Sequence, residues 1–150
     1  MKQGIVWTIA GLLLFTACAD SKVEITAPTP DNQAREICAH FLGRVPMKVA
    51  DKSKRDVNGD SALTAAWGNP AITLRCGVSE PANMTPASQL VSVNEIDWFP
   101  QELSAGWRFT STNTSVRVEV SVPKEFQPEA NALVDLTTSL RPLIISASAE

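Results

Sequence analysis

Few residues in this 150-residue sequence have side chains that could carry out covalent or acid–base chemistry. The cysteines are Cys18, Cys38 and Cys76, and the only histidine is His40. The sequence contains neither the Cys-x-x-Cys spacing of a redox pair nor the Gly-x-Ser-x-Gly motif of a serine nucleophile. So few sulfur and imidazole ligands leave little room for a zinc site. We therefore expect no metal and no cofactor.

Two carboxylates, Glu95 and Asp97, are the remaining candidates for acid–base catalysis. A glycosidase needs two carboxyl groups about 5–9.5 Å apart, so this pair is compatible with a carboxylate-based cell-wall hydrolase. Acidic pairs at this spacing are also common on solvated strand edges. His40 is expected on the solvent face of its helix, away from any nucleophile. A protein without enzymatic activity is therefore the prediction, and a hydrolase is the alternative.

The N-terminus has the layout of an export signal. Lys2 precedes an apolar run over residues 5–15, which is too short to span a bilayer, since a helical span needs about 20 residues. The run leads into Phe-Thr-Ala-Cys18, which resembles the bacterial lipobox, where the cysteine is diacylated and the chain is cut before it. Residues 1–17 are thus predicted to be a lipoprotein signal peptide, with Cys18 as the lipid attachment site. This would anchor the chain on the outer face of the cytoplasmic membrane; an ordinary signal peptide and a secreted product are the alternative.

Export changes the expectation for the other two cysteines. Cys38 and Cys76 would lie in an oxidising compartment, where two cysteines in one small domain usually form a disulfide. Two buried free thiols are the alternative. Residues 18–30 contain two prolines and no sustained periodicity, so a flexible tether is expected there. Residues 31–150 are expected to form a single domain.

Composition limits the possible partners. Hydrophobic residues make up 44% of the chain and charged residues 19%, which allows a substantial core. The net charge of −3 argues against nucleic-acid binding, because that requires a basic face. The stretch from Asp56 to Asp60 resembles the start of an EF-hand loop. Ser61 and Trp67 stand where that loop needs Gly and Glu, so a solvated turn is the simpler interpretation.

Hydrophobic periodicity predicts an α+β fold. Apolar residues recur at helical spacing over residues 31–42, with Cys38 in the apolar stripe, and again after Pro128. Alternation marks strands over 71–76 and 116–122, with shorter ones near residues 91 and 109. We expect a small antiparallel sheet of about four strands, with an N-terminal and a C-terminal helix packed on one face. Cys38 and Cys76 would then meet between the first helix and the sheet.

The tryptophans are candidates for a binding surface. Trp98 stands beside Asp97 and near Asn94, and an indole face with carboxylate and amide neighbours can hold a sugar ring or a peptide end. Trp67 and Trp107 are further candidates, and core packing is the alternative for each. Another hypothesis is recruitment of an envelope partner through an exposed polar face of the sheet. The side chains expected to project from that face are Arg75, Arg117 and Glu119.

Several stretches of the sequence resemble one known family. They are Ala66-Trp67-Gly68-Asn69-Pro70, Leu74-Arg75-Cys76-Gly77-Val78, Val93-Asn94-Glu95-Ile96-Asp97-Trp98 and Pro128-Glu129-Ala130-Asn131-Ala132-Leu133-Val134-Asp135. These segments are similar to the DUF3515 family of small exported, often lipobox-bearing proteins of actinobacteria. The family usually has Gly where Glu95 stands, so the turn before Trp98 is expected to differ.

The resemblance implies a cell-envelope protein held in place by an N-terminal lipid. It brings no enzymatic activity, because the family is a domain of unknown function. Together with the residue patterns, it predicts a non-catalytic binding or accessory module. The expected partners are the membrane, through the lipid, and a cell-wall glycan or an envelope protein.

Overall fold

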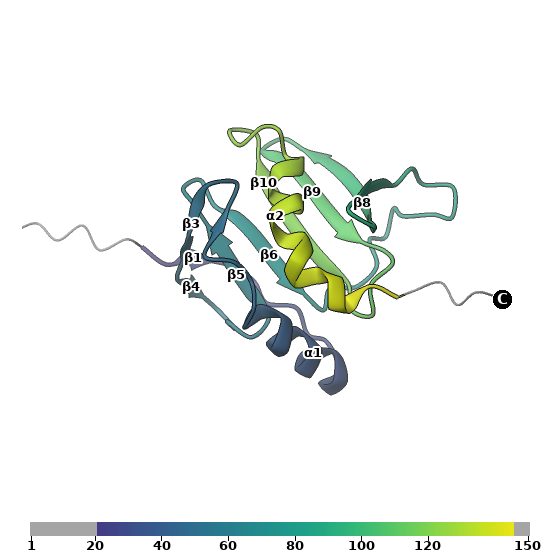
Figure 1. The fold of residues 1–150 in the computed structure, drawn as a ribbon, viewed down its shortest axis with the longest axis horizontal. Coiled ribbons are helices and arrows are strands. Elements are labelled where there is room, and N and C mark those ends of the chain that lie inside the picture. The colour runs from purple at the N-terminus through teal and green to yellow at the C-terminus, as the bar shows by residue number, and fades with distance from the viewer. Residues whose placement is uncertain (1–20, 146–150) are drawn as a thin grey trace, which may run out of the picture.

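The computed structural model describes residues 21–145, which form an α+β fold with one large sheet and two helices (Figure 1). The strands are β1 (Val23–Glu24), β2 (Lys48–Val49), β3 (Lys52–Arg55), β4 (Val57–Asn58), β5 (Thr64–Trp67), β6 (Ile72–Cys76), β7 (Val91–Val93), β8 (Ile96–Leu103), β9 (Gly106–Ser111) and β10 (Val118–Pro123). The helices are α1 (Asn32–Leu42), α2 (Ala130–Leu140) and a 3₁₀ turn at Arg141–Leu143. The predicted signal peptide and Cys18 lie outside the described residues.

The main sheet has eight antiparallel strands in the order β2-β3-β5-β6-β10-β9-β8-β7. The expectation of about four strands is therefore wrong. Alternation predicted the central strands β6 and β10, each of which buries every second residue. It could not reveal β5, because all four residues of that strand are buried. Nor could it reveal β3, because its sequence Lys-Ser-Lys-Arg is polar throughout.

Both helices pack on one face of the sheet. The inward residues of β6, Leu74 among them, form one core cluster with Phe41 of α1 and Leu136 of α2. Figure 1 shows α2 lying across this face. The helix contacts both edge strands, β2 and β7, so the sheet curves around it. Among residues 21–145, no helix is long and apolar enough to cross a bilayer.

The first helix begins where its capping residue predicts. The Asp31 side chain accepts a hydrogen bond from the backbone N–H of Ala34 at 2.8 Å, which satisfies a free donor of the first turn. One turn on, Arg35 forms an ion pair with Asp60 in the loop after β4. This guanidinium lowers the pKa of the Asp60 carboxyl, and the backbone N–H of Ala62 adds to the effect.

Residues 23–30, expected to belong to a flexible tether, are instead docked on the domain. Strand β1 pairs in parallel with β4, and the backbone N–H of Val23 donates to the carbonyl of Asp56 at 2.9 Å. Ile25 is buried and Ala27 packs against the core. The reason is a short alternation of Val23, Ile25 and Ala27 that gives the segment one apolar face.

Candidate functional site

The described tryptophans differ sharply in exposure. Trp67 and Trp98 are each 0% exposed, and the indole N–H of Trp67 donates to the carbonyl of Pro46 at 2.9 Å. Both rings are therefore part of the core. Trp107 keeps part of its surface exposed and stacks on Phe109, with the ring centroids 6.2 Å apart. Among the described tryptophans, only Trp107 can present a ring face to a ligand.

The candidate ligand residues Asn94, Asp97 and Trp98 belong to the β7–β8 hairpin, Asn94 in its turn and the other two in β8. Asn94 and Glu95 are the two turn residues between β7 and β8, with φ angles of 48° and 71°. The Asn94 amide donates to the Thr137 hydroxyl of α2 at 3.3 Å, which ties the turn to the helix. Trp98 lies fully buried beneath it. The three residues thus do not form a surface around an exposed indole.

Asn113 braces the same turn from the loop after β9. Its amide nitrogen donates to the Glu95 carbonyl at 2.8 Å, and its amide oxygen accepts from the Asp97 N–H at 2.9 Å. The Asp97 carbonyl in turn accepts from the N–H of Thr112 at 2.9 Å. The backbone polar groups of Asp97 therefore point away from β7, toward β9. The motif that suggested a ligand site is held by structural contacts.

The two carboxylates considered for hydrolysis are not brought together in a cleft. The Glu95 side chain is 73% exposed and forms an ion pair with Arg141 at 3.4 Å. Asp97 lies next to the turn, and neither residue lines the two clefts described below. Within residues 21–145, no group of three or more histidine, cysteine or acidic side chains is placed to hold a metal ion.

A cleft opens between the N-terminal end of α2 and the β7–β9 part of the sheet. We call it the Trp107 cleft; its volume is about 280 Å³. Its walls are Val91, Val93, Pro100, Trp107, Phe109 and Leu133, and Glu129 and Ala130 complete it at the start of α2. The lining is thus almost entirely apolar, with a partly exposed indole on one wall and one carboxylate at the rim. Such a lining suits an apolar group carried by a larger ligand.

The Trp107 cleft borders an open strand edge. Strand β7 is the last strand of the sheet, and Ser92 is exposed between Val91 and Val93. Ser92 stands opposite Asp97, whose backbone groups point toward β9. Ser92 and Asp97 are therefore a non-hydrogen-bonded pair, and the N–H and C=O of Ser92 face the open edge. Backbone pairing to a further strand is possible at this edge.

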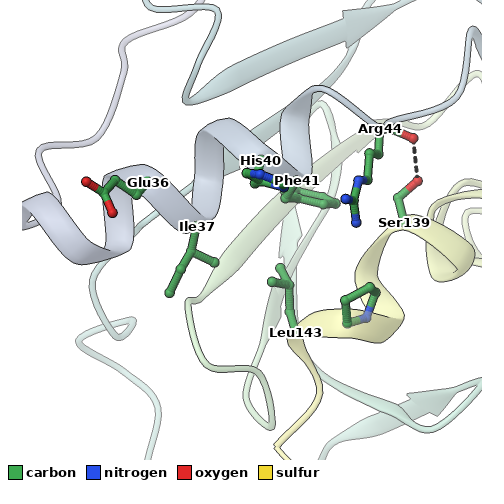
Figure 2. Close-up of a pocket in the computed structure, with 8 residues that line it drawn as sticks. Glu36, Ile37, His40, Phe41, Arg44, Ser139 and Leu143 are labelled. Atoms are coloured by element: carbon green, nitrogen blue, oxygen red, sulfur yellow. Dashed lines mark hydrogen bonds between the residues drawn. The ribbon is translucent and has the colours of Figure 1, made fainter.

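A second cleft, the helix groove, lies between α1 and the end of α2 (Figure 2). Its floor is apolar and consists of Ile37, Phe41, Pro142 and Leu143. Its rim carries the polar side chains Glu36, His40, Arg44 and Ser139. The volume is about 290 Å³, which is similar to that of the Trp107 cleft.

The rim of the helix groove lacks the geometry of a nucleophile and its base. The Ser139 hydroxyl donates to the carbonyl of Arg44 at 2.9 Å, as Figure 2 shows. Its proton is therefore directed at the backbone and not at the imidazole of His40. His40 is exposed, as its helical position predicted. The groove can hold an apolar group, but its side chains do not form a nucleophile–base pair.

The charged residues on the outer face of the sheet bind one another. Arg75 donates to Glu119 at 3.0 Å, and Arg108 approaches the other oxygen of the same carboxylate at 3.6 Å. Arg117 pairs with Glu80 in the loop after β6. These ion pairs engage the terminal guanidinium nitrogens of Arg75 and Arg117, whereas the buried Nε atoms of both arginines have no hydrogen-bond partner.

The predicted disulfide is confirmed: Cys38 of α1 is bonded to Cys76 at the end of β6, with the two Cα atoms 5.6 Å apart. Both cysteines are 0% exposed. The bond fixes α1 against the sheet and thereby sets one wall of the helix groove. Sequence reasoning named Trp107 only as one of three candidates and did not identify Ser92. Ser92 could not be identified from the sequence, because its role depends on β7 being the last strand of the sheet, and the strand order was not known.

Comparison with known proteins yields one match. A family model described as "Protein of unknown function (DUF3515)" matches residues 5–144. No curated protein and no solved structure shows significant similarity to the chain. The match covers both clefts, the disulfide and the hairpin turn at Asn94.

Proposed function

The chain belongs to the DUF3515 family, and from this premise we propose that it is a lipid-anchored, non-catalytic binding module of the cell envelope. Its location in this proposal is the outer face of the cytoplasmic membrane. The anchor rests on the sequence: an apolar run over residues 5–15 leads into a lipobox-like motif that ends at Cys18. Two acyl chains on one cysteine provide the two signals that stable anchoring needs.

The observation that supports a binding role is the pairing of the Trp107 cleft with the open edge of β7. The edge offers backbone N–H and C=O groups at Ser92, and the cleft beside it accepts apolar side chains. An extended peptide can use both features, because its backbone pairs with the edge while alternate side chains enter the cleft. The proposed ligand is therefore an extended, apolar segment of an envelope protein.

The chemistry of the cleft favours a peptide over a glycan. A sugar ring needs several polar partners around the aromatic face that it stacks on, because its hydroxyl groups must keep their hydrogen bonds. The side chains of the Trp107 cleft provide one carboxylate, Glu129, and otherwise apolar surface. An apolar side chain beside an aromatic ring loses no hydrogen bond on entering such a cleft.

The anchor is tested with Cys18→Ala in the full chain. We expect the wild-type protein to incorporate labelled fatty acid and to remain in the membrane fraction. The variant should lose the label. If the variant is still labelled, or the wild-type chain is not, Cys18 is not the lipid attachment site.

The binding role is tested by photo-crosslinking in intact cells. A benzoylphenylalanine placed at Leu90, which is 46% exposed and adjoins β7, should form a discrete protein adduct. The matched control is the same probe at Val134, 47% exposed on α2 and outside both clefts. Adducts that disappear on muramidase digestion would identify a glycan instead. Equal adduct yields from both positions would contradict the proposed site.

A further inference from the structure

The docked strand β1 fixes which part of the domain lies next to a lipid on Cys18. β1 begins at Val23 and is held by β4, so the chain is attached to the domain from that point on. Lys22 follows Cys18 by four residue steps along the chain, and each step spans at most about 3.5 Å. The Cα atom of Lys22 therefore lies within about 14 Å of that of Cys18. This inference rests on the lipid anchor of the proposed function.

A polar cavity of about 270 Å³ lies at this corner of the domain. Lys22, Lys54 and Arg55 line it, together with a single acidic residue, Asp56. The Arg55 guanidinium donates hydrogen bonds to the carbonyls of Gly68 and Ser21. These bonds hold its positive charge at a fixed position in the cavity. The lysines are exposed or partly exposed. The cavity thus carries more positive than negative groups in a chain whose net charge is negative.

We propose that this cavity binds the phosphate of an anionic phospholipid in the membrane that carries the anchor. Charge complementarity selects this occupant: lysine and arginine recognise phosphate oxygens, and the headgroup phosphates carry the negative charge of a phosphatidylglycerol bilayer. The short connection to Cys18 lets the cavity come within a Debye length, about 8 Å, of the bilayer surface. The domain then lies against the membrane with β1 and β4 facing it, and the Trp107 cleft, on the helix-covered face of the sheet, remains open.

The experiment compares two bilayers with the full-length, membrane-extracted protein. The protein is reconstituted in nanodiscs of phosphatidylcholine alone or of phosphatidylcholine with phosphatidylglycerol. Lysine acetylation is then followed by peptide mass spectrometry. Because each cation near an anionic surface adds about fivefold to membrane affinity, we expect acetylation of Lys22 and Lys54 to slow at least about threefold in the anionic discs. Lys124, exposed after β10, is the internal control and should react equally in both.

Variants give the reciprocal test. Lys54→Gln should abolish the protection of Lys22, whereas the matched Lys124→Gln should leave it unchanged. Equal acetylation of Lys22 in the two bilayers would overturn the proposal. Protection by inorganic phosphate alone in phosphatidylcholine discs would also overturn it, because free phosphate and not a lipid would then be the ligand.

The same mass spectra test the phospholipid site and the lipid anchor on Cys18 independently. Acylation of Cys18 is measured directly as a mass increase on its peptide. Acylation without protection of Lys22 refutes only the lipid site. Protection without acylation refutes the anchor and supports the site.

Discussion

Cys38 of α1 is bonded to Cys76 of β6, and these two residues join the first helix to a central strand of the sheet. The bond closes a long loop that contains β2, β3, β4 and β5. These four strands include the most polar part of the sheet. The disulfide therefore limits the conformational freedom of a segment that contains both the polar strand β3 and the fully buried strand β5.

Removing this bond should lower stability. Closing a loop of 38 residues is worth about 4 kcal/mol in the chain-entropy model. We expect Cys38→Ser to lower the free energy of unfolding by about that amount, measured by urea denaturation. Adding a reductant should destabilise the wild-type protein and leave the variant unchanged. A reductant effect of similar size in both proteins would show that the bond does not contribute to stability.

The turn at Glu95 should gain stability from glycine. Glu95 has a φ of 71°, a left-handed conformation that costs a residue with a Cβ about 1 kcal/mol. Glu95→Gly is therefore expected to raise the free energy of unfolding by roughly 0.5–1 kcal/mol, measured by thermal or chemical denaturation. Glu95→Ala is the matched control, because it also removes the exposed ion pair to Arg141 but keeps the Cβ. A gain in the alanine variant equal to that in the glycine variant would contradict this explanation.

The Arg35–Asp60 ion pair should make stability depend on pH in the acidic range. Arg35 lowers the pKa of Asp60 in the folded state, so the folded protein binds fewer protons at this site than the unfolded chain does. The stabilisation is complete above the unfolded pKa of about 3.9 and is lost as the pH falls through the lower folded value. Asp60→Asn should therefore cost about 1 kcal/mol at pH 7 and less at pH 2, in denaturant titrations at each pH.

The variant Arg35→Gln tests whether Arg35 is the side chain that stabilises the ionised Asp60. Arg35→Gln should lose a similar amount at pH 7, and the double variant should lose less than the sum of the two. Additive losses would mean that the two side chains do not interact. A cost of Asp60→Asn that does not change between pH 7 and pH 2 would mean that ionisation of Asp60 is not involved.

The open edge of β7 should be sensitive to proline at one position. Ser92→Pro removes an N–H that faces the edge and makes no bond to β8, so the hairpin should persist. The adduct from the probe at Leu90 should then fall at least about tenfold, because the partner strand loses a backbone hydrogen bond and meets the proline ring. Ser92→Ala keeps the N–H and should retain the adduct. Equal losses in both variants would assign the effect to the hydroxyl and contradict strand addition.

Sequence patterns predicted the parts of the fold in which one side faces the core and the other faces water. This applies to α1, β6 and β10, and it placed Cys38 and Cys76 close enough to bond. The patterns failed for β3 and β5 for opposite reasons: one is polar throughout and the other is buried throughout. Composition also misled at β1, where the prolines after it suggested a flexible segment.

The candidate site was harder to predict because exposure is a property of the whole fold. Trp98 and Trp107 both lie in strands with aromatic and polar neighbours, yet one is fully buried and the other is not. Strand order sets their surroundings: β7 pairs with β8 only up to Trp98, and beyond that residue β8 contacts the loop before β7, where the Gln101 amide donates to Asn83. Pro100 is tolerated there, since its register with β9 directs the side of its missing N–H away from β9, where no strand pairs with it. The order of β7, β8 and β9 in the sheet cannot be predicted from hydrophobic patterns in the sequence.

The central claim is that the Trp107 cleft binds a protein segment. The most direct test is the yield of the Leu90 adduct in Trp107→Leu, compared with Val134→Ala as an exposed control. A tryptophan at the centre of an interface typically contributes at least about 2 kcal/mol, so we predict a loss of at least about tenfold in Trp107→Leu and none in Val134→Ala. Circular dichroism and an intact Cys38–Cys76 bond establish that the variant is folded. An unchanged adduct in folded Trp107→Leu would contradict the account.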